Sequence, residues 1–407
     1  MAIEIDVAVI GGGPAGMAAA IESAKQGART LIIERNAELG GILMQCIHNG
    51  FGLAYFKEEL TGPEYAYKFR KLVSEQKNIV VMTNTFVTKI SGKTITITNQ
   101  DGVMDIKAKA IVLAMGARER TAANILLQGT RPAGILTAGA AQKMTNIQGK
   151  MPGKEIVILG SGDIGLIMAR RLTLEGARVK AVLEINKNTS GLKRNIVQCL
   201  DDFKIPLLMQ TTIVEVVGDG RVKGVYISTV DDNYNFVGEK KFVKCDTVIL
   251  SVGLIPETDL VDFAQIHPRT NGPVVDDYME TSCRGVFACG NFLHVHDLVD
   301  NVTLESIDAG KNAADFALGK TKKGKAFEVM AGNNISYVNP SFVHSGAGVI
   351  KLRFRIREKF AKKWINVVSN GEIIAKKYVL AGLPGEMQTL EVEREKIKSD
   401  VLLEVEK

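Results

Sequence analysis

Gly11-Gly12-Gly13-Pro14-Ala15-Gly16 is the stretch that decides the fold, and its pattern returns at Gly160-Ser161-Gly162-Asp163-Ile164-Gly165. Each copy reads G-x-G-x-x-G, follows an apolar run (residues 5–10 and 156–159) and precedes a helical stretch. Glycines at these positions permit a tight turn and allow a pyrophosphate to approach the N-terminus of the helix. One such motif would be weak evidence, and a glycine turn that binds nothing is the alternative. Two copies in the same strand–turn–helix context predict two dinucleotide-binding units.

An acidic residue follows each motif at the end of a second apolar strand, Glu34 in the first unit and Glu184 in the second. A carboxylate roughly 20 residues after the glycines accepts hydrogen bonds from a ribose hydroxyl, and an acid there favours NADH over NADPH. The predicted nucleotide-binding residues are Gly11, Gly13, Pro14, Ala15, Gly16, Glu34, Arg35, Gly40 and Gly41 in the first unit, and Gly160, Gly162, Asp163, Ile164, Gly165 and Glu184 in the second.

Length, charge and cysteine content restrict the classes of protein to which the chain can belong. The 407 residues are enough for two or three domains, and the net charge of +6 is modest. We expect no signal peptide, because no basic segment precedes the first strand, and no integral membrane segment, because the apolar runs are only strand-sized. Five scattered cysteines suit a reducing cytoplasm. No segment resembles a nucleic-acid-binding motif, and no Cys or His spacing predicts a metal or iron–sulfur site.

The rest of the core shows the same order of parts in both units. Residues 79–90 and 93–98 are typical of a small β-meander, which leads to a buried strand ending near Gly116; residues 247–252 and Gly253 form the matching segment. A short strand then ends at Gly290-Asn291. A helix is expected from about Thr303 to Leu318, with Leu304, Ile307 and Ala309 on its apolar side.

The last 80 residues or so differ in character. Residues 350–357 alternate between apolar and basic side chains, as in a strand with one wet face. Asn370-Gly371 is a strong hairpin signal, and residues 387–392 and 401–405 suggest two further strands. The pattern predicts a small antiparallel β-sandwich at 330–407. We expect this region to dock a partner subunit or a second copy of this chain, with its basic face free to meet an acidic surface. The alternative is a lid that packs against its own core.

With these motifs, the chain resembles the flavoproteins with two dinucleotide-binding domains, a superfamily that includes thioredoxin reductases and lipoamide dehydrogenases. Ala114-Met115-Gly116 is similar to the family's Ala-Thr-Gly motif. The segment ending at Gly290-Asn291 resembles the motif whose closing Asp holds the FAD ribityl chain, with Asn291 in place of the Asp. The resemblance implies an α/β fold of two Rossmann-like three-layer domains. The FAD domain would span 1–119 and 254–322, with the NAD domain (120–253) inserted. It also implies FAD contacts at Ala114, Gly116, Gly290, Asn291, Val302 and Thr303.

A second resemblance is to flavoprotein subunits of amine, opine and anaerobic glycerol-3-phosphate dehydrogenases, carried by residues 39–52, 116–120 and 294–300. It implies a partner dehydrogenase subunit and a small redox subunit, for which an iron–sulfur protein is one candidate, in a hetero- or homo-oligomer. The expected function is an FAD-dependent subunit that moves hydride between NAD(H) and flavin in glycerol-3-phosphate oxidation. The alternatives are a self-contained NADH:acceptor reductase and an assembly subunit with a vestigial NAD site.

The redox cysteine pair of the disulfide reductases is absent. Its C-x4-C positions fall on Leu43 and His48, with Cys46 between them. We therefore expect electrons to leave the flavin by another route. His48 is a candidate proton or hydrogen-bond donor to the flavin, or a histidine satisfied by backbone groups. Cys46 is a second catalytic candidate, or packing. His294 and His296 are expected to orient Asp297, to face a partner, or to serve the loop alone.

Overall fold

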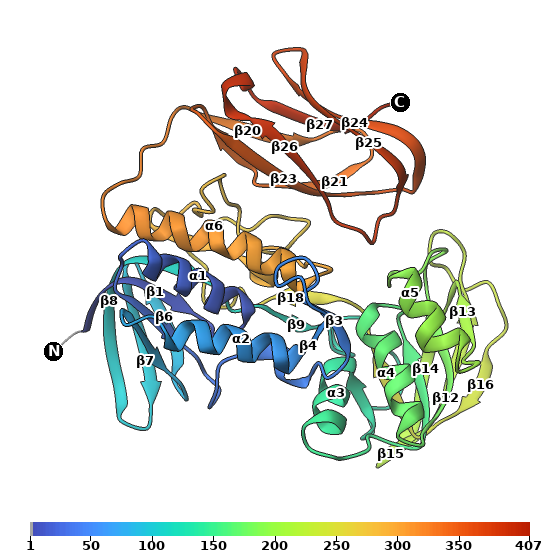
Figure 1. Cartoon of the computed structure of the whole chain (residues 1–407). Helices are drawn as coiled ribbons and strands as arrows, with labels where there is room; N and C mark the ends of the chain where they lie inside the picture. Colours follow the sequence, from blue (N-terminus) through green and yellow to red (C-terminus); the bar gives the residue numbers. More distant parts are fainter. Residues whose placement is uncertain (1–2) are drawn as a thin grey trace. The chain divides into compact units, whose positions relative to one another are not determined.

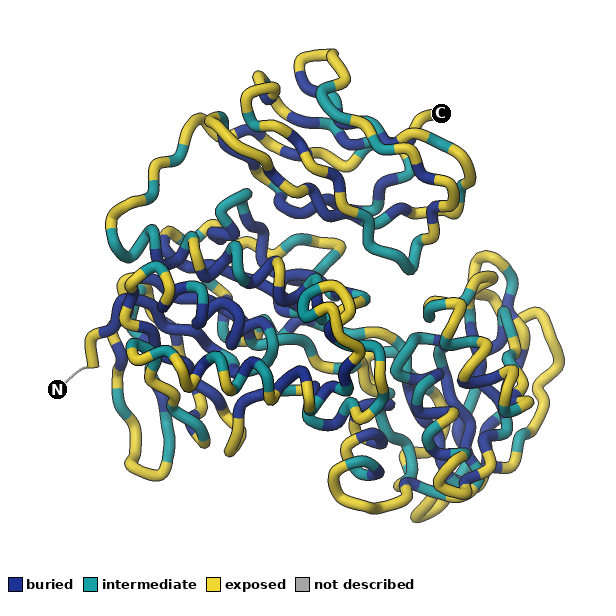
Figure 2. Tube along the Cα trace, viewed as in Figure 1, coloured by how far each residue is buried: buried dark blue, intermediate teal, exposed yellow. Residues whose placement is uncertain are grey.

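The computed structural model describes residues 3–407 (Figure 1). The chain divides into two compact units, one made of the segments up to Ala117 and from Pro256 onward, the other of Arg118–Ile255. Figure 2 shows that buried residues are concentrated in the central strands and along one side of the helices, and that many loop residues are exposed. Among the described residues, no helix is both long and apolar enough to cross a bilayer.

A mostly parallel sheet forms the centre of the first unit, in the order β5-β2-β1-β8-β7-β6 with β19 also paired to β8. Its strands are β1 (Ile3–Ile10), β2 (Thr30–Ile33), β5 (Ile79–Met82), β6 (Phe86–Ser91), β7 (Thr94–Asn99), β8 (Gly102–Leu113) and β19 (Val286–Ala288). The helices of this unit are α1 (Pro14–Lys25), α2 (Gly62–Ser74) and α6 (Val299–Ala317), and β3 (Asn49–Phe51) pairs with β4 (Leu60–Thr61). Strands β1 and β2 are apolar almost throughout because both of their faces are covered.

Two expectations for this unit are wrong in detail. The stretch 79–90 is not part of one meander: a turn at Asn84, whose φ is 49°, separates β5, which is parallel to β2, from β6 of the antiparallel hairpin. Helix α6 begins at Val299, before the expected Thr303. Leu304 is exposed, and the buried face of α6 instead carries Glu305 and Ser306.

The second unit is built around a five-stranded parallel sheet in the order β10-β17-β11-β12-β13. These strands are β10 (Ile135–Thr137), β11 (Glu155–Leu159), β12 (Arg178–Glu184), β13 (Leu207–Met209) and β17 (Thr247–Leu250). The helices are α3 (Ala138–Asn146), α4 (Asp163–Leu174) and the short α5 (Lys193–Ile196). A three-stranded sheet contains β14 (Thr211–Asp219), β15 (Arg221–Thr229) and β16 (Lys241–Lys244), and β9 (Ala117–Glu119) pairs with β18 (Leu254–Pro256). Both units thus have the α/β architecture that the sequence predicts.

Residues beyond α6 form a sandwich of two sheets, ordered β22-β20-β27-β24-β25 and β21-β23-β26. The strands are β20 (Ala326–Ala331), β21 (Ile335–Asn339), β22 (Phe342–His344), β23 (Val349–Ile356), β24 (Phe360–Ser369), β25 (Glu372–Gly382), β26 (Gln388–Glu393) and β27 (Val401–Val405). Asn370 and Gly371 have φ values of 53° and 77°, as the tight hairpin turn requires. The sandwich is antiparallel except that β20 and β27 are parallel.

Two of the basic side chains of β23, Arg353 and Arg355, are not free, contrary to expectation. Arg353 is buried, with Nη1 3.6 Å from a carboxylate oxygen of Glu305 on α6. Arg355 is largely buried, pairs with Asp297 and donates to the carbonyl oxygen of Val295. This strand therefore contacts its own unit through its arginines, while Lys351 remains exposed.

Candidate functional site

The two G-x-G-x-x-G segments, residues 11–16 and 160–165, are called the first and second fingerprint loops. The first connects β1 to α1 and combines a closed turn with open space. Gly11 has a φ of +103°, and a Cβ there would lie 2.4 Å from the carbonyl oxygen of Ala114 at the end of β8. Gly13 has extended backbone angles, and a Cβ there would meet only the Cα of Gly41, at 4.0 Å. The space in front of Gly13, at the N-terminus of α1, is therefore open to a group as large as a pyrophosphate.

The loop between β11 and α4 repeats this construction. Gly160 has a φ of +97°, and a Cβ there would lie 2.1 Å from the carbonyl oxygen of Ser251, just after β17. Gly162 is extended and would meet Ser251 Oγ first, at 3.1 Å. In both units the first glycine closes the turn onto a neighbouring strand. The second glycine has open space beside it in the first unit, whereas in the second unit it lies close to Ser251. This geometry fits a dinucleotide in each unit.

The two acids are held by matching sets of donors. Glu34 accepts a hydrogen bond from Gly12 N at 2.7 Å through one oxygen and from Asn36 N at 2.7 Å through the other. Glu184 accepts from Ser161 N at 3.0 Å and from Asn186 N at 2.9 Å in the same arrangement. Both carboxylates are buried at the end of a strand, beside their glycine loops. The glycine spacing did not predict these hydrogen bonds to the two acids, although the sequence does show an Asn two residues after each acid.

The remaining predicted residues of the loops have different surroundings. Pro14 and Ala15 begin α1, and Gly16 and Gly165 lie in the first turns of their helices. Asp163 accepts from Leu192 N at 2.8 Å and from Asn195 Nδ2 at 2.7 Å, so its side chain fastens the following loop. The side chain of Ile164 packs against the apolar core of its unit, and Arg35 is exposed.

Ala114, Gly116, Gly290 and Asn291 lie where β8 and β19 end, beside the first fingerprint loop. A Cβ on Gly290 would lie 2.8 Å from the Cβ of Ala15, which shows how close the two motifs are. Asn291 Oδ1 accepts from His296 N at 3.0 Å. Its amide nitrogen is therefore the group that can donate to a ligand hydroxyl, and an amide fits a ribityl chain in place of the family's Asp.

The start of α6 is fixed to the segment around β3, β4 and α2. Val302 and Thr303 are buried, and Thr303 Oγ1 lies 2.7 Å from the hydroxyl of Tyr65. Burial raises the pKa of Tyr65, so the phenol stays protonated. Asp300 accepts from Ala54 N at 3.2 Å and Tyr55 N at 3.4 Å. The backbone of α6 can thus present its N-terminus to a ligand while its side chains hold the helix in place.

His48 and Cys46 occupy a half-buried loop of the same unit. His48 Nδ1 lies 3.0 Å from the carbonyl oxygen of Asn49, and its ring contacts Phe51 at a centroid distance of 5.0 Å. Cys46 Sγ donates to the carbonyl oxygen of Ile42 at 3.3 Å. No disulfide joins any cysteines within residues 3–407. Burial raises the pKa of the Cys289 thiol to about 12, which makes it a poor nucleophile.

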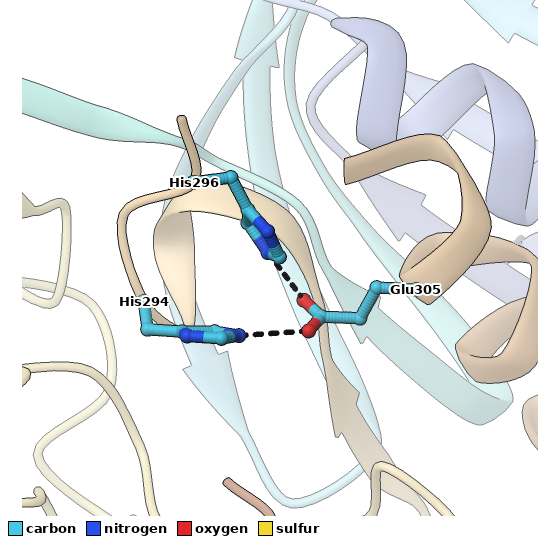
Figure 3. A group of neighbouring side chains, drawn as sticks. All are labelled: His294, His296 and Glu305. Atoms are coloured by element: carbon cyan, nitrogen blue, oxygen red, sulfur yellow. Dashed lines mark hydrogen bonds and ion pairs between the residues drawn. The ribbon is translucent and has the colours of Figure 1, made fainter. Parts of the chain in front are cut away.

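A buried group that the sequence did not predict lies behind Gly290 (Figure 3). Glu305 on α6 accepts a hydrogen bond from His294 Nε2 at 2.8 Å on one carboxylate oxygen and from His296 Nε2 at 3.1 Å on the other. Burial lowers the pKa of His294 to about 4, so the ring is neutral at neutral pH. Burial alone would raise the pKa of Glu305, but the hydrogen bonds that it accepts from His294 and His296 hold it well below the usual value.

The two histidines therefore do not orient Asp297 as expected, since that carboxylate pairs with Arg355. The signal that could have revealed the group is Glu305 itself. It lies at helical spacing from Val302 and Ala309 on the buried face of α6, where an unpaired acid would be costly.

Comparison with known proteins shows that the chain is similar to reductases and to subunits of oxidases. A family model described as pyridine nucleotide-disulphide oxidoreductase matches residues 5–314. An opine oxidase subunit from Rhizobium meliloti is 26% identical over 321 residues, which cover 70% of this chain and 58% of that protein. Thioredoxin reductase of Mycolicibacterium smegmatis is 28% identical over 308 residues, covering 75% of this chain and 91% of that protein.

The solved structure of thioredoxin reductase from T. acidophilum supports the same fold. It aligns with a TM-score of 0.64 at 22% sequence identity and covers 77% of this chain and 99% of its own. The family match stops at residue 314, before the sandwich. The chain spans between 27% and 61% of the length of the opine and sarcosine oxidase subunits that it matches.

Proposed function

The chain belongs to the pyridine nucleotide-disulphide oxidoreductase family, which uses FAD and NAD(P)H, and on that basis we propose that it is the flavoprotein subunit of an FAD-dependent NAD(H) oxidoreductase. The observation that carries the proposal is the pair of fingerprint loops, each with a turn closed by its first glycine and an acid held by backbone hydrogen bonds. Two such loops in one chain suit two different dinucleotides.

Each loop supplies a defined set of groups. In the first unit, the N-terminus of α1 and Gly13 would hold the pyrophosphate of FAD, Glu34 its adenosine ribose, and Asn291 the ribityl chain. In the second unit, the N-terminus of α4 and Glu184 would hold NAD(H). Bound FAD would supply two-electron redox chemistry with the nicotinamide. His48 remains a candidate proton or hydrogen-bond donor to the flavin, and Cys46 is a weaker candidate.

Electrons would then pass to or from a partner dehydrogenase or redox subunit, because the chain lacks the family's C-x4-C pair. Relatives that are themselves named as subunits, such as those of the opine and sarcosine oxidases, favour a multi-subunit assembly. The sequence resemblance to flavoprotein subunits of glycerol-3-phosphate dehydrogenase makes glycerol-3-phosphate oxidation the pathway that we propose.

The hairpin of β24 and β25 is the part of the sandwich best suited to a partner. Strand β25 is at the edge of its sheet, and its Ile373, Tyr378 and Leu380 are exposed. The ring of Trp364 on β24 contacts that of Tyr378 at a tilt, with a centroid distance of 5.1 Å, and lies under the Lys376 ammonium group. An exposed aromatic and aliphatic strip with lysines beside it suits an apolar partner surface with an acidic rim.

Anaerobic stopped-flow mixing of the purified protein with NADH tests the proposal. We expect yellow protein whose flavin absorbance bleaches rapidly. Absence of bleaching in both the isolated and the assembled protein would favour the assembly subunit with a vestigial NAD site. Fast turnover with small acceptors and no need for any partner would favour the self-contained reductase. Loss of co-purification with the dehydrogenase in Tyr378→Glu, but not in the exposed Val103→Glu control, would support docking through β25.

A further inference from the structure

Glu305 carries a fixed negative charge in the interior of the first unit. Besides the two imidazoles, it accepts a hydrogen bond from Gly290 N at 2.9 Å, and its side chain is completely buried. An ionised carboxylate only accepts, so each imidazole must keep its proton on Nε2. His296 Nδ1 is buried and has no hydrogen-bond partner. The negative charge of the group lies on the Glu305 carboxylate.

The backbone of Gly290 joins this charge to the proposed flavin crevice. Gly290 follows β19, and a Cβ on it would contact both Ala15 of the fingerprint loop and Val302 of α6. Ligands of open α/β sheets bind at this edge, outside the carboxyl ends of the strands. Because Glu305 is shielded from water, its field is weakly screened there.

The nearest counter-charge comes from the sandwich. Arg353 on β23 places Nη1 3.6 Å from one Glu305 oxygen and Nη2 3.7 Å from Asp308. The Arg353 side chain is 8% exposed, whereas Asp308 is about half exposed. The sandwich thus contributes a buried positive charge to the group, beside Tyr337 and Asn339, which approach His294.

We propose that Glu305 lowers the reduction potential of the flavin bound in this crevice, and that Arg353 of the sandwich limits this effect. The inference rests on the proposed binding of FAD to the first unit. Reduction adds negative charge to the flavin, so a fixed negative charge nearby opposes reduction and a positive charge favours it. Glu305 and Arg353 are positioning residues that act through their electrostatic fields and through the backbone of Gly290. Because Arg353 belongs to the sandwich, the sandwich helps to set the reduction potential of the flavin.

The test is an anaerobic redox titration of the full-length holoprotein against a dye of known potential. Glu305→Gln keeps the shape of the side chain and removes its charge. We expect it to favour flavin reduction by at least about tenfold in the equilibrium constant, a rise of about 30 mV for a two-electron couple. Arg353→Gln should shift the potential in the opposite direction, and Arg353→Lys should restore it. Asp308→Asn is the matched control and should have a smaller effect, since solvent screens that charge.

Shifts of opposite sign for Glu305→Gln and Arg353→Gln support the inference, since loosened packing would not produce them. An unchanged potential in yellow Arg353→Gln protein overturns it, and so do two shifts of the same sign. If Glu305→Gln does not fold, the comparison of Arg353→Gln with Arg353→Lys decides. Stoichiometric zinc or iron in the wild-type protein would also overturn it, because a metal ion would then occupy the His294–Glu305–His296 group. Colourless wild-type protein would instead refute FAD binding and the proposed function.

Discussion

Gly13→Ala should weaken FAD binding while leaving the fold intact. The backbone at Gly13 has φ −74° and ψ −172°, which any residue can adopt. The added methyl group would contact no protein atom closer than the Cα of Gly41, at 4.0 Å. It would point into the space that we assign to the pyrophosphate. The cost should therefore appear only when the cofactor binds.

The size of the effect follows from overpacking. Inserting a methyl group into a filled site typically costs about 1–3 kcal/mol. That range corresponds to an increase of about 5- to 150-fold in the FAD dissociation constant. The larger Gly13→Val side chain should yield colourless protein. Gly11→Ala is the contrasting case, because its Cβ would lie 2.4 Å from a carbonyl oxygen in the chain itself, and folding should suffer with or without FAD.

Titration of apoprotein with FAD, followed by flavin fluorescence, measures the dissociation constant, and thermal unfolding of the apoprotein checks the fold. Gly162→Ala is the corresponding change in the second unit, where the added methyl group would also lie 3.1 Å from Ser251 Oγ. It should weaken NADH binding and leave FAD binding unchanged. Wild-type FAD affinity in Gly13→Ala, together with yellow Gly13→Val protein, would show that the flavin is not held at this loop.

Three further changes test other parts of the structure. Glu184→Gln should reduce the preference for NADH over NADPH, read as the ratio of the two kcat/KM values; a wild-type protein that prefers NADPH would contradict this role. Acidification should destabilise the protein by up to about 3 kcal/mol between pH 6.5 and 4, because the unfolded His294 takes up a proton in this window and the buried ring does not. Denaturant unfolding across this range should lose most of that slope in His294→Gln, and an equal slope in both proteins would refute the assignment. Tyr65→Phe should cost about 1–3 kcal/mol of unfolding free energy, because it leaves the buried Thr303 hydroxyl unpaired; equal Tm values would contradict that bond.

The glycine motifs were readable from sequence because the required backbone geometry is local. Gly11 and Gly160 need positive φ, and few other residues adopt it, so their spacing alone predicts the turns. The Asn370-Gly371 hairpin was predictable for the same reason. The α/β fold follows from these turns and from the apolar strands beside them.

Contacts between segments far apart in the chain could not be predicted from the sequence. The alternation at 350–357 correctly predicted strand β23, but a basic face looks the same whether it meets solvent or a buried acid. Only the fold reveals that Arg353 meets Glu305, 48 positions earlier in the numbering, and that Arg355 meets Asp297. The contact of His294 and His296 with Glu305 was also not predicted, because their partner lies on the helix that follows them.

Strand β27 lies between β20 and β24, in the interior of its sheet. The sheet therefore cannot close until residues 401–405 have left the ribosome, and until then β20 and β24 have no common neighbour. Arg353 lies on β23, in the facing sheet of the same sandwich. A chain whose sandwich has not yet closed would carry Glu305 without this counter-charge, so FAD that binds before closure would meet a different electrostatic environment from FAD that binds to the finished protein.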